Sequence, residues 1–141
     1  MVVFLDTGFI LAIRNSDDNY HAKAAEMMKD CLSGKFGKII VSNFVFDETV
    51  TLTLVRTHNK NLVEDIGNYI LNSPRINVLH LSQAEFLATW EIFLKYFEKG
   101  LSFTDCSILV MAKLFESNVY IATFDSTFKG LIPVIDEFNG R

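Results

Sequence analysis

Short apolar runs that alternate with longer stretches of helical periodicity constrain the fold of this chain more than any other feature. The runs are rich in β-branched residues and span 2–5, 38–41, 76–81, 119–123 and 132–135. The predicted helices span 21–32, 44–55, 62–71, 83–98 and 104–115. Continuous apolar strands are typical of a parallel sheet with helices on both faces. The pattern therefore predicts an α/β fold with a mostly parallel sheet, formed by residues 1–141 as a single domain.

Composition narrows the classes of protein that the chain can belong to. The formal net charge is −4, which argues against nucleic-acid binding over the whole surface but leaves room for a local basic patch. Cys31 and Cys106 form neither a metal-binding spacing nor a disulfide framework, and no secretory leader is apparent. Every long apolar stretch is interrupted by polar residues. We therefore expect a cytoplasmic protein with no membrane span.

Two acids follow predicted strands directly. Asp6 comes after residues 2–5, and Asp125 lies two residues after the run at 119–123. The carboxyl ends of parallel strands are where α/β sheets bind their ligands. Each acid could instead cap a helix that follows it, because Asp is a favourable N-cap residue. Taken singly, the capping interpretation is the stronger one for both residues.

Two further acids occupy apolar helix faces. Within the helix predicted at 44–55, Glu48 shares one stripe with Phe44, Leu52 and Val55. Asp105 shares a face with apolar residues of the last predicted helix. The alternatives are a salt bridge for Glu48 and a favourable helix-dipole position for Asp105. Requiring four separate structural explanations is less economical than one shared site.

A shared site for four carboxylates requires a cation. Two like charges about 5 Å apart at an effective dielectric constant of about 20 repel by roughly 3 kcal/mol. A divalent metal ion would cancel this repulsion. Because the candidate ligands are all hard oxygens, the set favours Mg²⁺ or Mn²⁺ over Zn²⁺.

The motifs that carry these acids resemble those of a known family. They are Phe4-Leu5-Asp6-Thr7, Glu48 in the helix after the second strand, Phe103-Thr104-Asp105-Cys106, and Thr123-Phe124-Asp125-Ser126-Thr127-Phe128. In order and spacing the set resembles the PIN-domain ribonucleases, particularly the toxin components of prokaryotic toxin–antitoxin pairs. The resemblance extends over nearly the whole chain.

The resemblance implies a three-layer α/β sandwich whose five-stranded sheet has the order 3-2-1-4-5. It implies a metal-dependent endoribonuclease that cleaves single-stranded or structured RNA with Mg²⁺ or Mn²⁺. By match to the family's positions, the metal ligands and catalytic acids are Asp6, Glu48, Asp105 and Asp125. Thr7 and Thr123 match its helper hydroxyls. A small antitoxin partner and a homodimer or higher homo-oligomer are also implied.

Other readings of the function remain open at this point. A PIN-like module that binds RNA or protein without turnover would keep the fold, and a housekeeping RNA-processing nuclease would keep the chemistry. No glycine-rich nucleotide loop and no Gly-x-Ser-x-Gly motif is present. Arg56 and Lys60, near the end of the Glu48 helix, are weak candidates for contacts with RNA phosphates.

Aromatic residues crowd the helix predicted at 83–98. Trp90, Phe93 and Phe97 recur at spacings of three and four, which predicts a core stripe. Phe86 and Tyr96 extend the apolar area toward the surface. We expect mainly a core role for this helix, with a dimer contact as the alternative.

Overall fold

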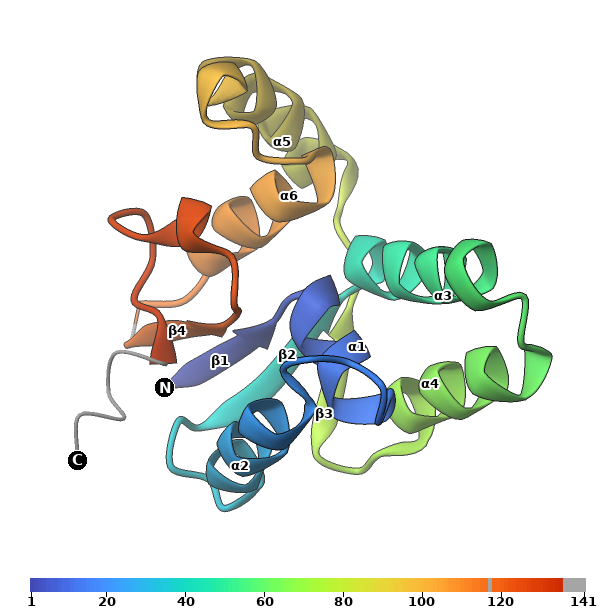
Figure 1. The fold of residues 1–141 in the computed structure, drawn as a ribbon. Helices are drawn as coiled ribbons and strands as arrows, with labels where there is room; N and C mark the ends of the chain where they lie inside the picture. Colours follow the sequence, from blue (N-terminus) through green and yellow to red (C-terminus); the bar gives the residue numbers. More distant parts are fainter. Residues whose placement is uncertain (117, 136–141) are drawn as a thin grey trace.

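The computed structural model describes residues 1–116 and 118–135. The elements, shown in Figure 1, are β1 (Val2–Leu5), α1 (Thr7–Arg14), α2 (His21–Leu32), β2 (Lys38–Ser42), α3 (Asn43–Thr57), α4 (Lys60–Asn72), β3 (Ile76–Leu79), α5 (Gln83–Lys95), α6 (Phe103–Ala112) and β4 (Val119–Ala122), with short 3-10 helices η1 (Phe97–Lys99) and η2 (Ser126–Phe128). The predicted α/β fold is confirmed.

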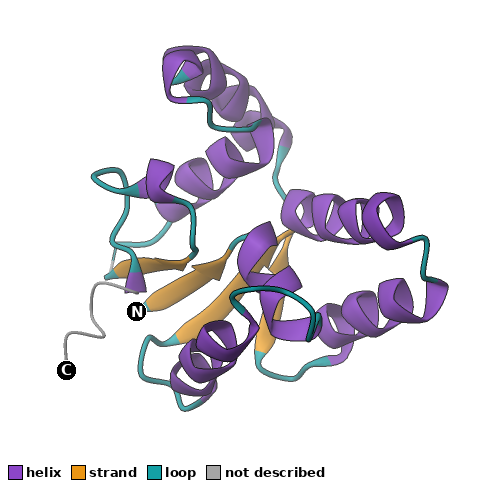
Figure 2. Ribbon diagram, viewed as in Figure 1, coloured by secondary structure: helices purple, strands orange, loops and turns teal. Residues whose placement is uncertain are grey.

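The sheet is parallel throughout and has the order β3-β2-β1-β4. All four residues of β1 are buried, because this strand lies between two neighbours and beneath helices. Figure 2 shows the four strands together, with α1 and α2 in front of them, α3 and α4 to one side and α5 and α6 above. The central position of β1 places the residue after it, Asp6, at the middle of the carboxyl edge.

The fifth predicted strand, at 132–135, does not form. A single parallel bridge joins Ile121 to Val134 beside β4, where the fifth strand was expected. The Ile121 amide donates to the Pro133 carbonyl at 2.9 Å. Pro133 has no amide hydrogen of its own, so the segment cannot continue a ladder of regular spacing. The predicted strand order is therefore correct for four strands, and the expected fifth strand is reduced to a single β-bridge.

Helix α1 was not among the helices predicted from periodicity. Phe9, Ile10, Leu11 and Ala12 are all buried within it. The apolar residues of this short helix follow β1 after only three residues, Asp6-Thr7-Gly8, so the sequence shows them as a continuation of the strand's apolar run. The helix follows β1 after one residue and so lies directly beneath the carboxyl edge.

The buried face of α3 differs from the predicted one. Val45, Thr49 and Thr53 are buried, whereas Val55, which was assigned to the core stripe, is 60% exposed. The Thr49 hydroxyl donates to the Val45 carbonyl at 2.6 Å, and the Thr53 hydroxyl donates to the Thr49 carbonyl at 2.8 Å. These bonds satisfy the hydroxyls within the helix, so threonine can occupy the core face. The stripe that contains Glu48 is thereby turned toward a pocket.

The core role predicted for the aromatic helix is largely wrong. Trp90 is 50% exposed and Phe97 is 65% exposed, while Thr89 is the one fully buried residue of α5. Phe93 and Tyr96 are partly buried and do pack against the core. Helix α5 packs chiefly on α6, and Figure 1 shows this pair projecting away from the sheet. We name the exposed apolar side chains of α5 and η1 the aromatic face: Phe86, Leu87, Trp90, Leu94 and Phe97.

None of the helices in residues 1–116 and 118–135 has both the length and the apolar character needed to cross a membrane.

Candidate active site

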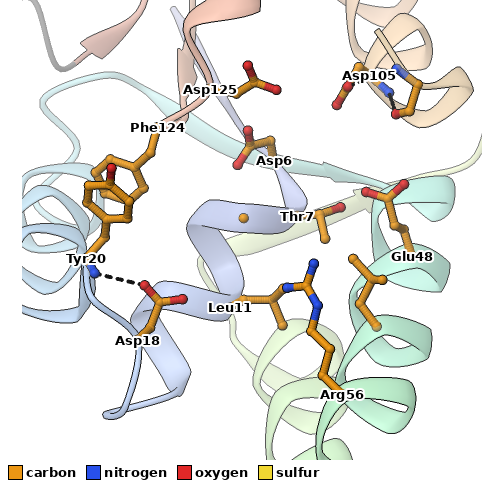
Figure 3. Close-up of a pocket in the computed structure, with 13 residues that line it drawn as sticks. Asp6, Thr7, Leu11, Asp18, Tyr20, Glu48, Arg56, Asp105, Phe124 and Asp125 are labelled. Carbon is orange, nitrogen blue, oxygen red and sulfur yellow. Dashed lines mark hydrogen bonds between the residues drawn. The ribbon is translucent and has the colours of Figure 1, made fainter. Parts of the chain in front are cut away.

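The four predicted acids line one pocket. Asp6 follows β1, Glu48 lies on α3, Asp105 lies in the first turn of α6, and Asp125 follows β4. The pocket has a volume of about 400 Å³, and Figure 3 shows the four carboxylates around its opening. Residues separated by up to 119 positions in sequence thus meet at the carboxyl edge of the sheet, as the strand-end argument predicted.

Asp6 is the most buried of the acids, at 5% exposure. Its Oδ1 accepts a hydrogen bond from the Phe9 amide at 2.8 Å, and its Oδ2 accepts one from the Thr123 hydroxyl. Burial raises the pKa of Asp6 from 3.8 to about 7. The two hydrogen bonds lower this pKa, and the nearby carboxylates of Asp105 and Asp125 raise it further. The Asp6 carboxyl group therefore takes up a proton near neutral pH when no cation is bound.

Asp105 forms a reciprocal capping box with Ser102 at the start of α6. The Ser102 amide donates to Asp105 Oδ2 at 3.0 Å, and the Asp105 amide donates to Ser102 Oγ at 3.0 Å. Burial raises the pKa of Asp105; the Ser102 hydrogen bonds lower it, and Glu48 and Asp125 raise it. The sequence Ser102-x-x-Asp105 before an apolar run is the signature of this box and could have located the helix start at Phe103.

Asp125 and Glu48 complete the acidic lining from opposite sides (Figure 3). Asp125 caps η2, because its Oδ1 accepts from both the amide and the hydroxyl of Thr127, at 2.9 and 2.7 Å. Within the part of the chain that the structure describes, neither Glu48 nor the other three acids pairs with a lysine or arginine. The salt bridge considered for Glu48 therefore has no basic partner among the described residues. Asp6 and Asp125 do cap the helices that follow them, and they also line the pocket.

The two predicted hydroxyls occupy different positions. Thr7 Oγ1 lines the pocket and is a buried polar atom with no hydrogen-bond partner among the described residues. Thr123 lies behind the pocket, where its hydroxyl donates to Asp6 and accepts from the Asp125 amide at 2.9 Å. Thr123 therefore links two of the acids, and Thr7 has an unused hydroxyl directed toward the cavity.

The donor set fits a hard divalent cation. All four candidate ligands are carboxylate oxygens, mutual repulsion contributes to the raised pKa of Asp6 and Asp105, and Thr7 offers an unsatisfied hydroxyl. Over residues 1–116 and 118–135, however, no three His, Cys, Asp or Glu side chains are close enough to form a ready-made metal site. The acids therefore share a pocket without forming a closed cage.

The two weak candidates for RNA contacts separate in the structure. Arg56 lines the pocket from α3 and is the one basic side chain among the described residues of its lining. Lys60 lies outside the lining and its Nζ is 3.7 Å from Glu64 Oε1 on α4. Arg56 therefore remains a candidate for a phosphate contact in the pocket, and Lys60 does not.

Among the pocket-lining residues that sequence reasoning missed are Asp18, Tyr20 and Phe124. Asp18 and Tyr20 lie between α1 and α2, where the Tyr20 amide donates to Asp18 Oδ1 at 2.8 Å. A turn has no periodicity that could identify them. Phe124 adjoins Asp125, and only the fold reveals that its ring stacks on Tyr20.

Two characterised relatives align over most of the chain. A VapC ribonuclease of Archaeoglobus fulgidus is 26% identical over 129 residues, which cover 91% of this chain and 80% of the relative. A 23S rRNA-specific endonuclease of Mycobacterium tuberculosis, VapC20, is 28% identical over 137 residues, which cover 96% of this chain and 100% of the relative.

Solved structures share the fold. The crystal structure of Mycobacterium tuberculosis VapC20, described as a toxin that cleaves the sarcin–ricin loop, has a TM-score of 0.77 at 24% identity, covering 89% of this chain and 92% of that one. The VapBC2 complex of Rickettsia felis, crystallised with a fragment of promoter DNA, contains a chain with a TM-score of 0.64 at 18% identity. The match covers 95% of this chain and 97% of that one.

The resemblance seen in the motifs extends to a match with a whole family model. The family model described as "PIN domain" matches residues 3–131, a range that contains β1 from its second residue onward, the other three strands and all four acids. The chain belongs to the PIN-domain family.

Proposed function

We propose that this chain is an endoribonuclease that hydrolyses phosphodiester bonds of single-stranded or structured RNA with Mg²⁺ or Mn²⁺. The observation that carries the proposal is the meeting of four carboxylates, none paired with a described basic residue, beside the unsatisfied hydroxyl of Thr7. The two relatives reported above are both named as RNA-cleaving enzymes, which supports the same activity.

Asp6 and Asp105 are the proposed central metal ligands, and Glu48 and Asp125 are proposed to complete the site directly or through water. A divalent cation, when bound, would neutralise charge on the phosphodiester and lower the pKa of an attacking water. The pocket needs this charge, because its lining contains five carboxylates and one guanidinium. Without a cation, the lining would repel an RNA phosphate.

The chain's own side chains would orient the reacting groups. The Thr123 hydroxyl holds Asp6 Oδ2 and accepts from the Asp125 amide, so it orients two proposed ligands together. The Thr7 hydroxyl is available to bond a water molecule or a phosphate oxygen. Arg56 at the pocket wall would contribute charge to substrate binding without reading bases.

We further propose that the chain is the toxin of a toxin–antitoxin pair and associates as a homodimer or higher homo-oligomer. The description of the similar VapC20 structure as a toxin supports the first part. The aromatic face supports the second, because five large apolar side chains are exposed over one helix and the turn that follows it. A housekeeping RNA-processing nuclease would share the chemistry but would need no antitoxin.

The decisive experiment is an RNA cleavage assay with single-stranded oligoribonucleotides and a sarcin–ricin-loop oligonucleotide, in EDTA and with added Mg²⁺ or Mn²⁺. We expect cleavage only with the metal ion. Glu48→Gln should lower the rate on the order of a hundredfold or more, because it removes a group of the charged site. Asp47→Asn is the matched control, since Asp47 is the exposed neighbour of Glu48 on α3.

Two outcomes would contradict the proposed activity. Binding of RNA without a metal-dependent product would favour the inactive binding module. An equal loss of cleavage rate in Glu48→Gln and Asp47→Asn would show that the position of Glu48 in the pocket has no special role in cleavage.

A further inference from the structure

Three aromatic rings form a column that rises from the core to the edge of the acidic pocket. Phe9 is fully buried in α1, and its ring centroid is 5.8 Å from that of Phe124. The Phe124 ring is stacked on Tyr20 with 4.5 Å between centroids and 10° between planes. Tyr20 is the outermost ring and is 52% exposed. Figure 3 shows the Tyr20–Phe124 pair on the same side of the pocket as Asp125.

Tyr20 and Phe124 border two adjoining cavities. One is the acidic pocket, and the second, of about 180 Å³, is also lined by Lys23, Lys129 and Asp125. Among the described residues, the second cavity is lined by Lys129, by Lys23, whose Nζ lies 5.9 Å from the Phe124 ring centroid, and by one carboxylate, that of Asp125, whereas the lining of the first cavity is strongly acidic. Of the two cavities, only the second has more basic than acidic side chains among its described lining residues.

We infer that the Tyr20–Phe124 pair is a base-stacking subsite for the RNA nucleotide that adjoins the scissile phosphate. This inference rests on the proposed ribonuclease function. Every nucleobase presents a flat π face, and proteins that bind single-stranded RNA stack bases on exposed aromatic rings. A base placed on Tyr20 would extend the existing column by one ring.

The ring pair is held by contacts within the chain itself. Phe124 is held between Phe9 and Tyr20, and the Tyr20 amide is fixed by Asp18 Oδ1 at 2.8 Å. Stacking on a preformed platform avoids the entropy cost of ordering side chains during binding.

The surroundings of the pair favour RNA over a protein side chain as the occupant. The pair adjoins the acids proposed to cleave RNA, and Lys23 and Lys129 line the neighbouring cavity, where a flanking phosphate would need positive charge. A strand that crosses the pair would thus have a base on Tyr20, one phosphate at the acids and the next near the lysines.

The test uses single-stranded oligoribonucleotides in which 2-aminopurine replaces one base at a time, because stacking quenches the fluorescence of this base. Binding is measured with Mn²⁺ and the Glu48→Gln variant, which slows cleavage. We expect quenching at one position beside the cleavage site. Adding Tyr20→Ala should abolish this quenching and raise Kd about tenfold, whereas Tyr20→Phe should keep both within about twofold.

Phe97→Ala is the matched control, because Phe97 is also exposed but belongs to the aromatic face. It should change neither the quenching nor the Kd. Thermal unfolding of Tyr20→Ala verifies that the fold is intact, and a loss of RNA binding only in proportion to unfolding would overturn the inference.

The remaining outcomes separate the subsite from the proposed function. If the wild type cleaves RNA and Tyr20→Ala leaves quenching and Kd unchanged, the subsite is wrong and the ribonuclease stands. If the wild type never cleaves but Tyr20 still quenches the bound base, the ring pair stacks a base, and both the catalytic proposal and the placement of that base beside a scissile phosphate are wrong. A Tyr20→Ala effect confined to binding of a small co-expressed protein would overturn the subsite.

Discussion

The acidic pocket and the aromatic face depart from the usual distribution of side chains in opposite directions. The pocket buries a carboxylate, Asp6, at 5% exposure, while the aromatic face leaves Trp90 half exposed to solvent. The four acids of the pocket come from four segments that are distant in sequence, whereas the aromatic face comes from one helix and the turn after it. A buried carboxylate and a half-exposed tryptophan ring each cost stability, because charges favour water and large apolar rings favour the core.

The two regions also differ in how they are held. Asp6, Asp105 and Asp125 are each fixed by hydrogen bonds that cap a helix start, so local structure orients groups that repel each other. In the aromatic face, Phe86 contacts Phe103 of α6 and Phe44 of α3, and Trp90 stacks on Phe93 of its own helix. This difference indicates that the pocket is organised for a small charged ligand and that the aromatic face is suited to a large apolar partner.

The largest effect should come from removing a charge from the pocket. The pKa of Asp6 is about 7 in the fold and 3.8 ordinarily. Proton uptake by Asp6 therefore stabilises the fold fully below about pH 4, and this stabilisation is lost as the pH rises through about 7. Each unit of difference between the two pKa values corresponds to about 1.4 kcal/mol in the free energy of unfolding. In EDTA, the thermal stability of the wild type should fall between about pH 5 and pH 8, and Asp6→Asn should flatten this dependence.

Metal addition provides the control for that measurement. Mn²⁺ should restore the thermal stability of the wild type at the alkaline end of the pH range, where the carboxylates are ionised. It should have little effect on the thermal stability of Asp6→Asn. If instead Asp6→Asn is destabilised in EDTA by about 3–5 kcal/mol, Asp6 is part of a buried ion pair and the comparison with the aromatic face fails.

An intermediate effect should follow from placing a charge on the aromatic face. Trp90→Glu should raise the dimer dissociation constant at least tenfold, about 1.4 kcal/mol, without lowering thermal stability, because this ring is half exposed. Sedimentation equilibrium measures the change, with Gln83→Glu at the polar start of α5 as control. A wild type that sediments only as a 16.0 kDa species at micromolar concentration would refute the dimer.

The smallest effect should distinguish two basic residues near the end of α3. Arg56→Ala should weaken RNA binding about threefold and reduce the salt dependence by about one phosphate contact, because Arg56 lines the pocket. Lys60→Ala should leave both unchanged, since Lys60 lies beside Glu64 and away from the pocket. A filter-binding titration at several salt concentrations measures both variants. Equal effects of the two substitutions would mean that RNA also contacts the outer end of α3.

Elements with strong local signals were predicted closely from the sequence. β1 and α2 have the predicted bounds, Val2–Leu5 and His21–Leu32. Their residues carry the information locally, as a continuous apolar run in one case and as a periodic pattern between a polar turn and two glycines in the other. The fifth strand was predicted from the same kind of run, but Pro133 limits it to one bridge.

The faces of the helices were predicted less well. The stripe of Phe44, Leu52 and Val55 is more apolar than that of Thr49 and Thr53, yet the threonines face the core. In α5 the largest rings face solvent. Periodicity identifies the side chains that share a face, but the neighbouring elements decide which face is buried.

The sequence by itself determined the parallel α/β fold, the order of the first four strands through the family resemblance, and the four acids as one set. These features depend on chemistry that is local to each segment and on spacing between segments. Only the tertiary structure decided that Thr123 links Asp6 to Asp125, that Arg56 and not Lys60 reaches the pocket, and that Tyr20 stacks on Phe124. Each of these contacts joins residues whose separation in space is set by how helices pack on the sheet, a quantity that no single segment encodes.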